Sequence, residues 1–192
     1  MNTPAHLIFG MTVFGQAHRQ AVTAAAFAGA MIPDLSLYAL AGTHLLILGT
    51  DPNVVFGQLY FSEGWQSIFR IDNSFILWGI ACVIGIMMRS QVMIALCGAA
   101  LLHLLFDFAL HHDDGRAHFW PLSTWIFESP VSYWDPNHYG NIVGPIEILL
   151  SLACCVVLWR RYVGKWMRGL IVALGVLQAA PTIIFGLMFA GG

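Results

Sequence analysis

Histidine and aspartate recur between His103 and His118, in the run HLLFDFALHHDDGRAH, which begins inside an apolar stretch. If residues 92–114 form one helix, four of these side chains lie at roughly 0°, 40°, 80° and 20° around its axis: His103, Asp107, His111 and Asp114. His112 falls on the opposite face of that helix. Imidazole and carboxylate groups on adjacent turns are the donors that zinc, manganese or iron require. The run therefore predicts a site for a divalent metal, with zinc favoured.

The length of this stripe limits how many ions it can hold. From His103 to Asp114 the helix rises by roughly 16 Å, which is too far for one coordination sphere. One ion fits His103 and Asp107. A second fits Asp107 and His111, with the carboxylate bridging two ions about 3.5 to 4 Å apart. Because Gly115 is a typical helix stop, we also expect His118 to fold back toward the site.

Other segments must supply further ligands. Asp34 follows Pro33 in a stretch that is otherwise mainly apolar, and an acidic residue at membrane depth favours function. His6 lies in the first turn of a helix that we expect to start at Thr3-Pro4. Glu147 is a candidate acceptor that orients a ligand histidine.

The elements that position these residues are membrane helices. The 192-residue chain is 58% hydrophobic and 9% charged, with a mean hydropathy of +0.74, whereas soluble domains carry roughly 25% charged residues. Apolar windows at 74–88, 92–110, 142–159 and 169–190 approach the ~20 residues that span a bilayer. We expect an all-α, polytopic transmembrane helical bundle of five or six helices in one domain, residues 1–192. The number of crossings within residues 5–50 stays open.

Charge predicts the orientation of the bundle. Four of the eight basic residues crowd the 160–168 loop, and positive loops are cytoplasmic. Residues 111–141 then lie outside, and the histidine and aspartate run opens to that side. The net charge of −2 argues against a nucleic-acid partner.

The long loop at about 111–141 is rich in aromatic residues. They are Phe119, Trp120, Trp125, Phe127, Tyr133, Trp134 and Tyr139. Such residues collect at membrane interfaces, and long loops beside sites often act as lids. An interfacial lid suits an amphiphilic substrate, such as a phospholipid or a lipid-linked phosphate.

Three motifs resemble a known family. GAMIPD, HLLFD and GRAHFWPLS are similar to segments of the membrane-bound metal-dependent hydrolases of the YdjM-like, LexA-regulated type, over most of residues 3–123. The resemblance implies a multi-helix hydrolase of the bacterial inner membrane, and with the orientation predicted from charge its site would face the periplasm. It also implies a ligand set of His6, Asp34, His103 and Asp107, with Arg70 and Ser74 near the site.

Four positions depart from the family pattern, which has Thr, Asp, His and His there: Ala5, Ser36, Phe69 and Asn73. Two interpretations follow. Either His111, His112 and His118 compensate for the missing ligands, or the chain keeps the scaffold with a smaller site and altered or absent chemistry.

Three classes of function remain. The first is a hydrolase in which a metal-activated water attacks an ester or phosphoester, with Arg70 or Arg116 holding an anionic leaving group. The second is a metal-binding or transport protein without hydrolysis. The third is a haem-binding or accessory subunit of a membrane complex with His103 and His44 as axial ligands, although the carboxylates so near His103 argue against haem. The oligomeric state is left undetermined.

Overall fold

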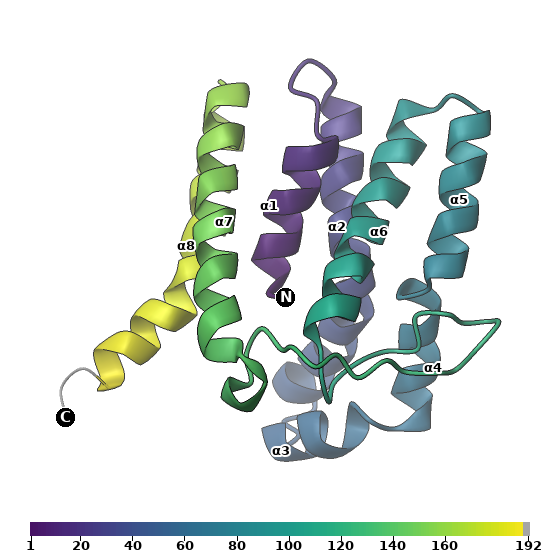
Figure 1. The fold of residues 1–192 in the computed structure, drawn as a ribbon, viewed down its shortest axis with the longest axis vertical. Helices are drawn as coiled ribbons and strands as arrows, with labels where there is room; N and C mark the ends of the chain where they lie inside the picture. The colour runs from purple at the N-terminus through teal and green to yellow at the C-terminus, as the bar shows by residue number, and fades with distance from the viewer. Residues whose placement is uncertain (190–192) are drawn as a thin grey trace.

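α-Helices dominate the computed structural model, which describes the backbone of residues 1–189 and the side chains up to residue 180. In chain order they are α1 (Thr3–Phe14), α2 (Gln20–Gly42), α3 (Pro52–Val54), α4 (Glu63–Asp72), α5 (Phe75–Met87), α6 (Gln91–Leu110), α7 (Gly140–Arg161) and α8 (Lys165–Phe189). No strand occurs within residues 1–189. The predicted all-α helical bundle is confirmed (Figure 1).

Four segments of the described chain are long and apolar enough to cross a membrane: Gln20–Ile47, Glu63–Met87, Gln91–Leu110 and Gly140–Arg161. The first joins α2 to a π-helical turn, Thr43–Ile47. Residues 20–47 therefore make one continuous helical segment. The second joins α4 to α5, so this segment starts earlier than the apolar window at residue 74.

The short helix α1 lies inside the bundle, between α7 on one side and α2 and α6 on the other (Figure 1). It also contacts α8. Leu7, Ile8 and Met11 of α1 are buried in a core that includes Leu158 and Tyr162. With 12 residues, α1 rises by only about 18 Å, so longer helices surround it over its whole length.

Glycines allow α1, α2 and α6 to approach one another closely. A Cβ atom on Gly29 of α2 would lie 1.9 Å from the carbonyl oxygen of Leu96 in α6. A Cβ on Gly10 of α1 would lie 2.7 Å from the Cβ of Ala30. Small residues at such contacts are typical of membrane helix packing, where close van der Waals contact replaces the hydrophobic effect. This packing holds α1 and α6 against α2.

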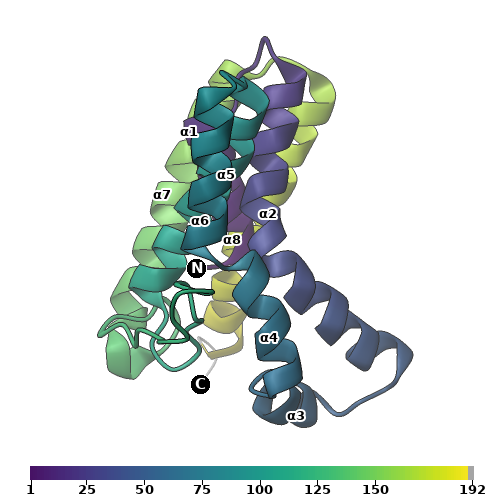
Figure 2. The same ribbon diagram turned by 90° about the vertical axis from the view of Figure 1, so that its right-hand side faces the viewer.

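Beyond the middle of the bundle, α2 leans away from the other helices, and α3 and α4 return beside it (Figure 2). The interior Pro33 accounts for the change of direction, because it cannot donate a helical hydrogen bond. Trp65 and Phe69 of α4 pack with Val55 and Tyr60 in a second buried core. The second half of α2 and the segment around α3 form one wall of the cavity described in the next section.

Helix α6 ends at Leu110, so the expectation of a single helix over 92–114 is wrong. The backbone is already extended at His111. Residues of the following loop form hydrogen bonds with the last carbonyl groups of the helix. Ser129 Oγ donates to the Ala109 carbonyl at 2.6 Å, and the Tyr133 N–H donates to the Leu110 carbonyl at 3.1 Å. These tertiary contacts replace further helical turns.

Candidate metal centre

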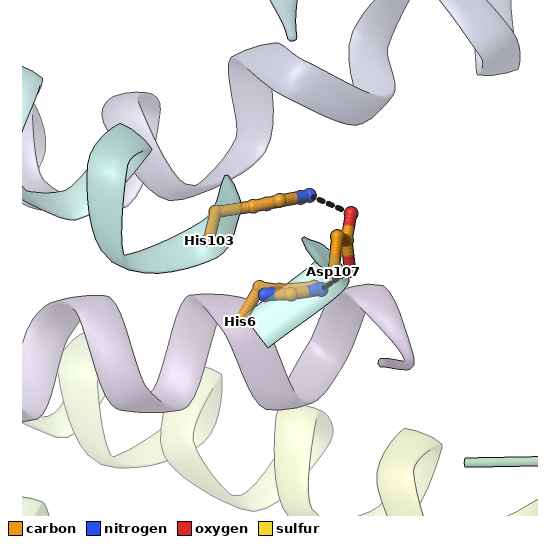
Figure 3. A group of neighbouring side chains, drawn as sticks. All are labelled: His6, His103 and Asp107. Carbon is orange, nitrogen blue, oxygen red and sulfur yellow. Dashed lines mark hydrogen bonds and ion pairs between the residues drawn. The ribbon is translucent and has the colours of Figure 1, made fainter. Parts of the chain in front are cut away.

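Three buried side chains converge where the start of α1 packs against the end of α6: His6, His103 and Asp107 (Figure 3). One donor atom of each residue lies within 4.8 Å of those of the other two. We call these residues the His/Asp cluster. Its two members on α6 lie one helical turn apart, as the sequence spacing predicted. The third, His6, lies on α1, almost 100 positions earlier in the chain.

The carboxylate of Asp107 faces both imidazoles (Figure 3). Nε2 of His6 lies 2.9 Å from Oδ1, and Nε2 of His103 lies 3.0 Å from Oδ2. The two rings stack in parallel, with centroids 3.5 Å apart and planes 8° apart. Both Nε2 atoms therefore point to the same small volume beside the carboxylate.

The contacts of His103 require either a second proton on its ring or a metal ion beside Asp107. Nδ1 of His103 lies 2.7 Å from the carbonyl oxygen of Ala30, which can only accept, so Nδ1 carries a proton. In a neutral ring, Nε2 then presents a lone pair to Asp107 Oδ2 at 3.0 Å. Two acceptors repel at that distance unless a second proton or a metal ion lies between them. A backbone acceptor on the far nitrogen is also the usual arrangement for metal-bound histidine, so the donor set fits a divalent metal.

Asp34 and His111 lie at the edge of the cluster. Oδ1 of Asp34 is 3.7 Å from Nε2 of His103. Nε2 of His111 is 3.2 Å from Oδ1 of Asp107, and its Nδ1 is 2.8 Å from Oδ1 of Asp114. The structure thus brings together five of the six residues predicted as ligands: His6, Asp34, His103, Asp107 and His111.

A cationic nitrogen also lies at this carboxylate. The ammonium group of Met1 is 3.0 Å from Oδ1 of Asp107 and 3.1 Å from Nε2 of His111. A metal ion at Asp107 has to displace this group or share the carboxylate with it.

Three other predicted site residues lie away from the cluster. Nδ1 of His118 donates to the carbonyl of Asn73 at 3.0 Å, and burial lowers the pKa of its imidazole to about 4, so the ring is neutral. Arg70 forms two hydrogen bonds with the exposed Glu63, at 2.7 and 3.0 Å. Ser74 is the N-cap residue of α5, where its hydroxyl accepts a backbone N–H. Each of these side chains has a structural partner.

His112 is also separate from the cluster. Its ring stacks on His138 with centroids 3.6 Å apart, and its Nδ1 bonds the Ser129 carbonyl at 2.7 Å. Of the three histidines considered as replacements for missing family ligands, the structure places only His111 at the cluster.

A cavity of about 600 Å³ opens beside the cluster. Its polar wall includes Asp34, Asp107, His111, Asp114 and Arg116. Arg116 is only 7% exposed, and its guanidinium carbon lies 4.5 Å from the ring centroid of Phe69. Its Nη1 has no hydrogen-bond partner. Arg116 is thus a buried cation at the cavity wall with an unused donor.

The apolar wall of the cavity was largely missed by the sequence analysis. It includes Tyr38, Phe56, Phe61, Trp134 and Leu177. Trp134 belongs to the predicted aromatic loop, as does Tyr133, which also lines the cavity, whereas Trp125 of the same loop packs against Phe119 and Phe127. Phe56, Phe61 and Leu177 lie in segments that carry no polar motif, so the sequence offers no signal for them, whereas Tyr38 lies one helical turn after Asp34.

Glu147 of α7 holds the first turn of α1. Its Oε1 accepts the backbone N–H of Asn2 at 3.1 Å and the side-chain amide of Asn2 at 3.3 Å. Gln178 of α8 donates to the same oxygen at 2.8 Å. Glu147 therefore positions the helix that carries His6, and it contacts the helix start where we expected it to contact a ligand histidine.

Replacing Glu147 with alanine is expected to weaken metal binding by roughly 10- to 100-fold, as the loss of a supporting group around a metal site does. The change frees the start of α1 and with it His6. Glu147→Gln keeps an acceptor oxygen for the Asn2 N–H and should retain most of the affinity. Metal titration of purified protein measures both variants, and unchanged affinity in Glu147→Ala would show that α1 is held by apolar packing alone.

Comparison of the chain with protein-family models, curated proteins and solved structures finds no match.

Proposed function

We propose that this protein is a membrane-embedded, metal-dependent hydrolase that acts on an ester or phosphoester of an amphiphilic, lipid-linked molecule. One observation carries the proposal: two histidines and an aspartate converge on the wall of a cavity of about 600 Å³. Structural metal sites are closed by four protein ligands, whereas catalytic sites combine three with an open position. The cluster offers three ligands, and Asp107 borders the cavity.

The donor set of two imidazoles and one carboxylate suits zinc best, with manganese and iron as alternatives. His111 and Asp34 lie at the edge of the cluster and add possible ligands. The proposal therefore includes either one or two ions. A bound divalent ion supplies a water whose pKa is lowered toward ~7, which makes it a nucleophile at neutral pH.

In this proposal Asp34 receives the proton of the attacking water. Its Oδ2 accepts a hydrogen bond of 2.5 Å from Thr3 Oγ1, which fixes the carboxylate at the cavity wall. The water oxygen forms a bond to the carbonyl carbon or phosphorus of the substrate as the ester bond breaks. The leaving alkoxide then takes a proton, either from Asp34 or from solvent.

We also propose that the protein lies in a bacterial inner membrane with the cavity on the periplasmic side. The basic 160–168 loop and the cluster lie at opposite ends of α1. Arg161 donates to the carbonyls of Met11, Thr12 and Gly15 at the end of α1, whereas His6 lies in its first turns. Because basic loops remain in the cytoplasm, the opposite end faces outward.

Alkaline phosphatase fused after Asn137 is expected to be active, and the same fusion after Gly164 inactive. The enzyme folds only outside the cytoplasm, so it reports the side on which each loop lies. The reverse pattern would place the cavity in the cytoplasm and exclude a periplasmic substrate.

Two measurements on detergent-purified protein test the hydrolase proposal. Elemental analysis should find a divalent metal, and a panel of lipid esters and phosphoesters should release head group or phosphate in a metal-dependent reaction. Bound metal without any hydrolysis would favour metal binding or transport. Absence of metal would reject both, and an absorption spectrum would reveal haem.

A further inference from the structure

Arg116 and Arg70 differ sharply in their surroundings. Arg70 is satisfied by a carboxylate at the surface of α4. Arg116 is 7% exposed and forms no ion pair among the side chains that the structure describes. Its guanidinium stacks on the ring of Phe69 at 4.5 Å and lies 5.9 Å from the ring centroid of Tyr60. Nη1 is left with no partner in a wall of the cavity.

We propose that Arg116 binds the phosphate group of a membrane lipid or lipid-linked molecule, whose hydrocarbon chain leaves the cavity between α2 and α8. This inference rests on the proposed function for its choice of cavity, and it names the substrate class that the hydrolase would take.

Burial and an unused donor together indicate an anionic ligand. Among the described side chains, Arg116 makes no ion pair within 4 Å, although the carboxylates of Asp34, Asp107 and Asp72 favour its charge from further away. An anion within hydrogen-bond distance of Nη1 would engage the donor that those groups leave free. The aromatic contact with Phe69 covers the guanidinium face, while the donors at its edge remain available. Arginine presents those donors in a planar fork that matches phosphate oxygens.

Phosphate fits this cavity better than a carboxylate does. A phosphomonoester has three terminal oxygens, so one oxygen can contact Arg116 while another faces the His/Asp cluster. The same cavity contains both Arg116 and Asp107 in its wall. A phosphoester bound in this way would bring its reacting phosphorus to the His/Asp cluster.

The apolar wall indicates that the rest of the ligand is lipid. Tyr38 of α2 and Leu177 of α8 both line the cavity, and they are 52% and 58% exposed. Phe56, Phe61 and Trp134 are likewise 48%, 56% and 51% exposed. In the proposed membrane orientation, this exposed apolar surface faces the bilayer. The cavity wall therefore continues from Arg116 to a surface that contacts acyl chains.

Binding of short-chain phosphatidic acid to detergent-purified protein tests the inference. We expect Arg116→Gln to weaken this binding at least about tenfold, as loss of a charge-assisted contact does. Arg116→Lys should retain part of it, because the charge persists without the fork. Arg70→Gln is the matched control and should bind like the unmodified protein. Dihexanoylglycerol, which lacks phosphate, should bind weakly to every variant.

Inorganic phosphate and a second variant separate the two parts of the inference. Leu177→Trp narrows the exit between α2 and α8, so it should weaken phosphatidic acid binding while inorganic phosphate binding stays constant. This variant leaves Arg116 intact and keeps the test decisive even if Arg116→Gln fails to fold. Equal affinity for inorganic phosphate and phosphatidic acid would overturn the lipid part.

Each titration is run with and without a metal chelator, and metal content is measured in parallel. Unchanged phosphatidic acid binding in Arg116→Gln, in protein that binds metal and hydrolyses a substrate, would overturn this inference and leave the proposed function standing. Arg116-dependent lipid binding in protein that never binds metal would uphold the inference and reject the hydrolase.

Discussion

Asp107→Asn is expected to lose most of its bound metal and any hydrolytic activity while the protein still inserts into the membrane. Both imidazoles of the cluster face this carboxylate at about hydrogen-bond distance, 2.9 Å for His6 and 3.0 Å for His103. Asparagine keeps the size of the side chain but removes the negative charge, and its amide nitrogen cannot ligate a cation. Elemental analysis of purified protein measures the loss.

His112→Ala is the control for Asp107→Asn. His112 follows the end of the same helix, yet its ring stacks on His138 and bonds the Ser129 carbonyl. Its removal should leave metal content nearly unchanged. Equal metal loss in both variants, or full occupancy in Asp107→Asn, would refute the cluster as the metal site.

Gly29→Ala is expected to destabilise the bundle by about 3 kcal/mol, near the upper range for overpacking. The new methyl group would lie 1.9 Å from the Leu96 carbonyl oxygen, and a backbone atom cannot move aside as a flexible side chain does. Helices α2 and α6 must then separate. Because the Ala30 carbonyl fixes the His103 ring, the metal affinity should fall as well. Thermal unfolding in detergent measures the first effect and metal titration the second.

Gly79→Ala on α5 is the matched control, since a Cβ there meets no atom within 4 Å among the described residues. Its stability should rise by about 0.5 to 1 kcal/mol, because alanine favours a helix more than glycine does. If Gly29→Ala melted at the same temperature as Gly79→Ala, close packing of α2 on α6 would not be what holds the bundle.

Local sequence spacing predicted the half of the site that lies on one helix. His103 and Asp107 are four residues apart in an apolar segment, so helical periodicity alone places them on one face. His6 and Asp34 could be singled out only as polar residues in apolar surroundings, because nothing local shows that two distant helices meet at α6. Their proximity depends on glycine contacts between α1, α2 and α6.

Long-range contacts explain what the sequence did not reveal. The end of α6 is set by Ser129 and Tyr133, about 20 residues further along the chain, which take its final carbonyl groups. Glu147 bonds Asn2 across 145 positions. Arg116 and Arg70 look alike in sequence, and only the fold shows that one is buried at a cavity while the other is paired at the surface.

The position of α1 bears on how the protein is synthesised. His6 leaves the ribosome about 100 residues before Asp107, a delay of roughly 5 to 20 s at ordinary rates of translation. During that interval α1, with a rise of about 18 Å, is too short to cross a hydrocarbon core of ~30 Å alone. It has to wait beside α2, with its imidazole unpaired, until α6 is inserted and α7 closes around it. A nascent chain arrested before α6 therefore leaves a short apolar helix with an unpaired imidazole, and the His/Asp cluster forms only once α6 has been made.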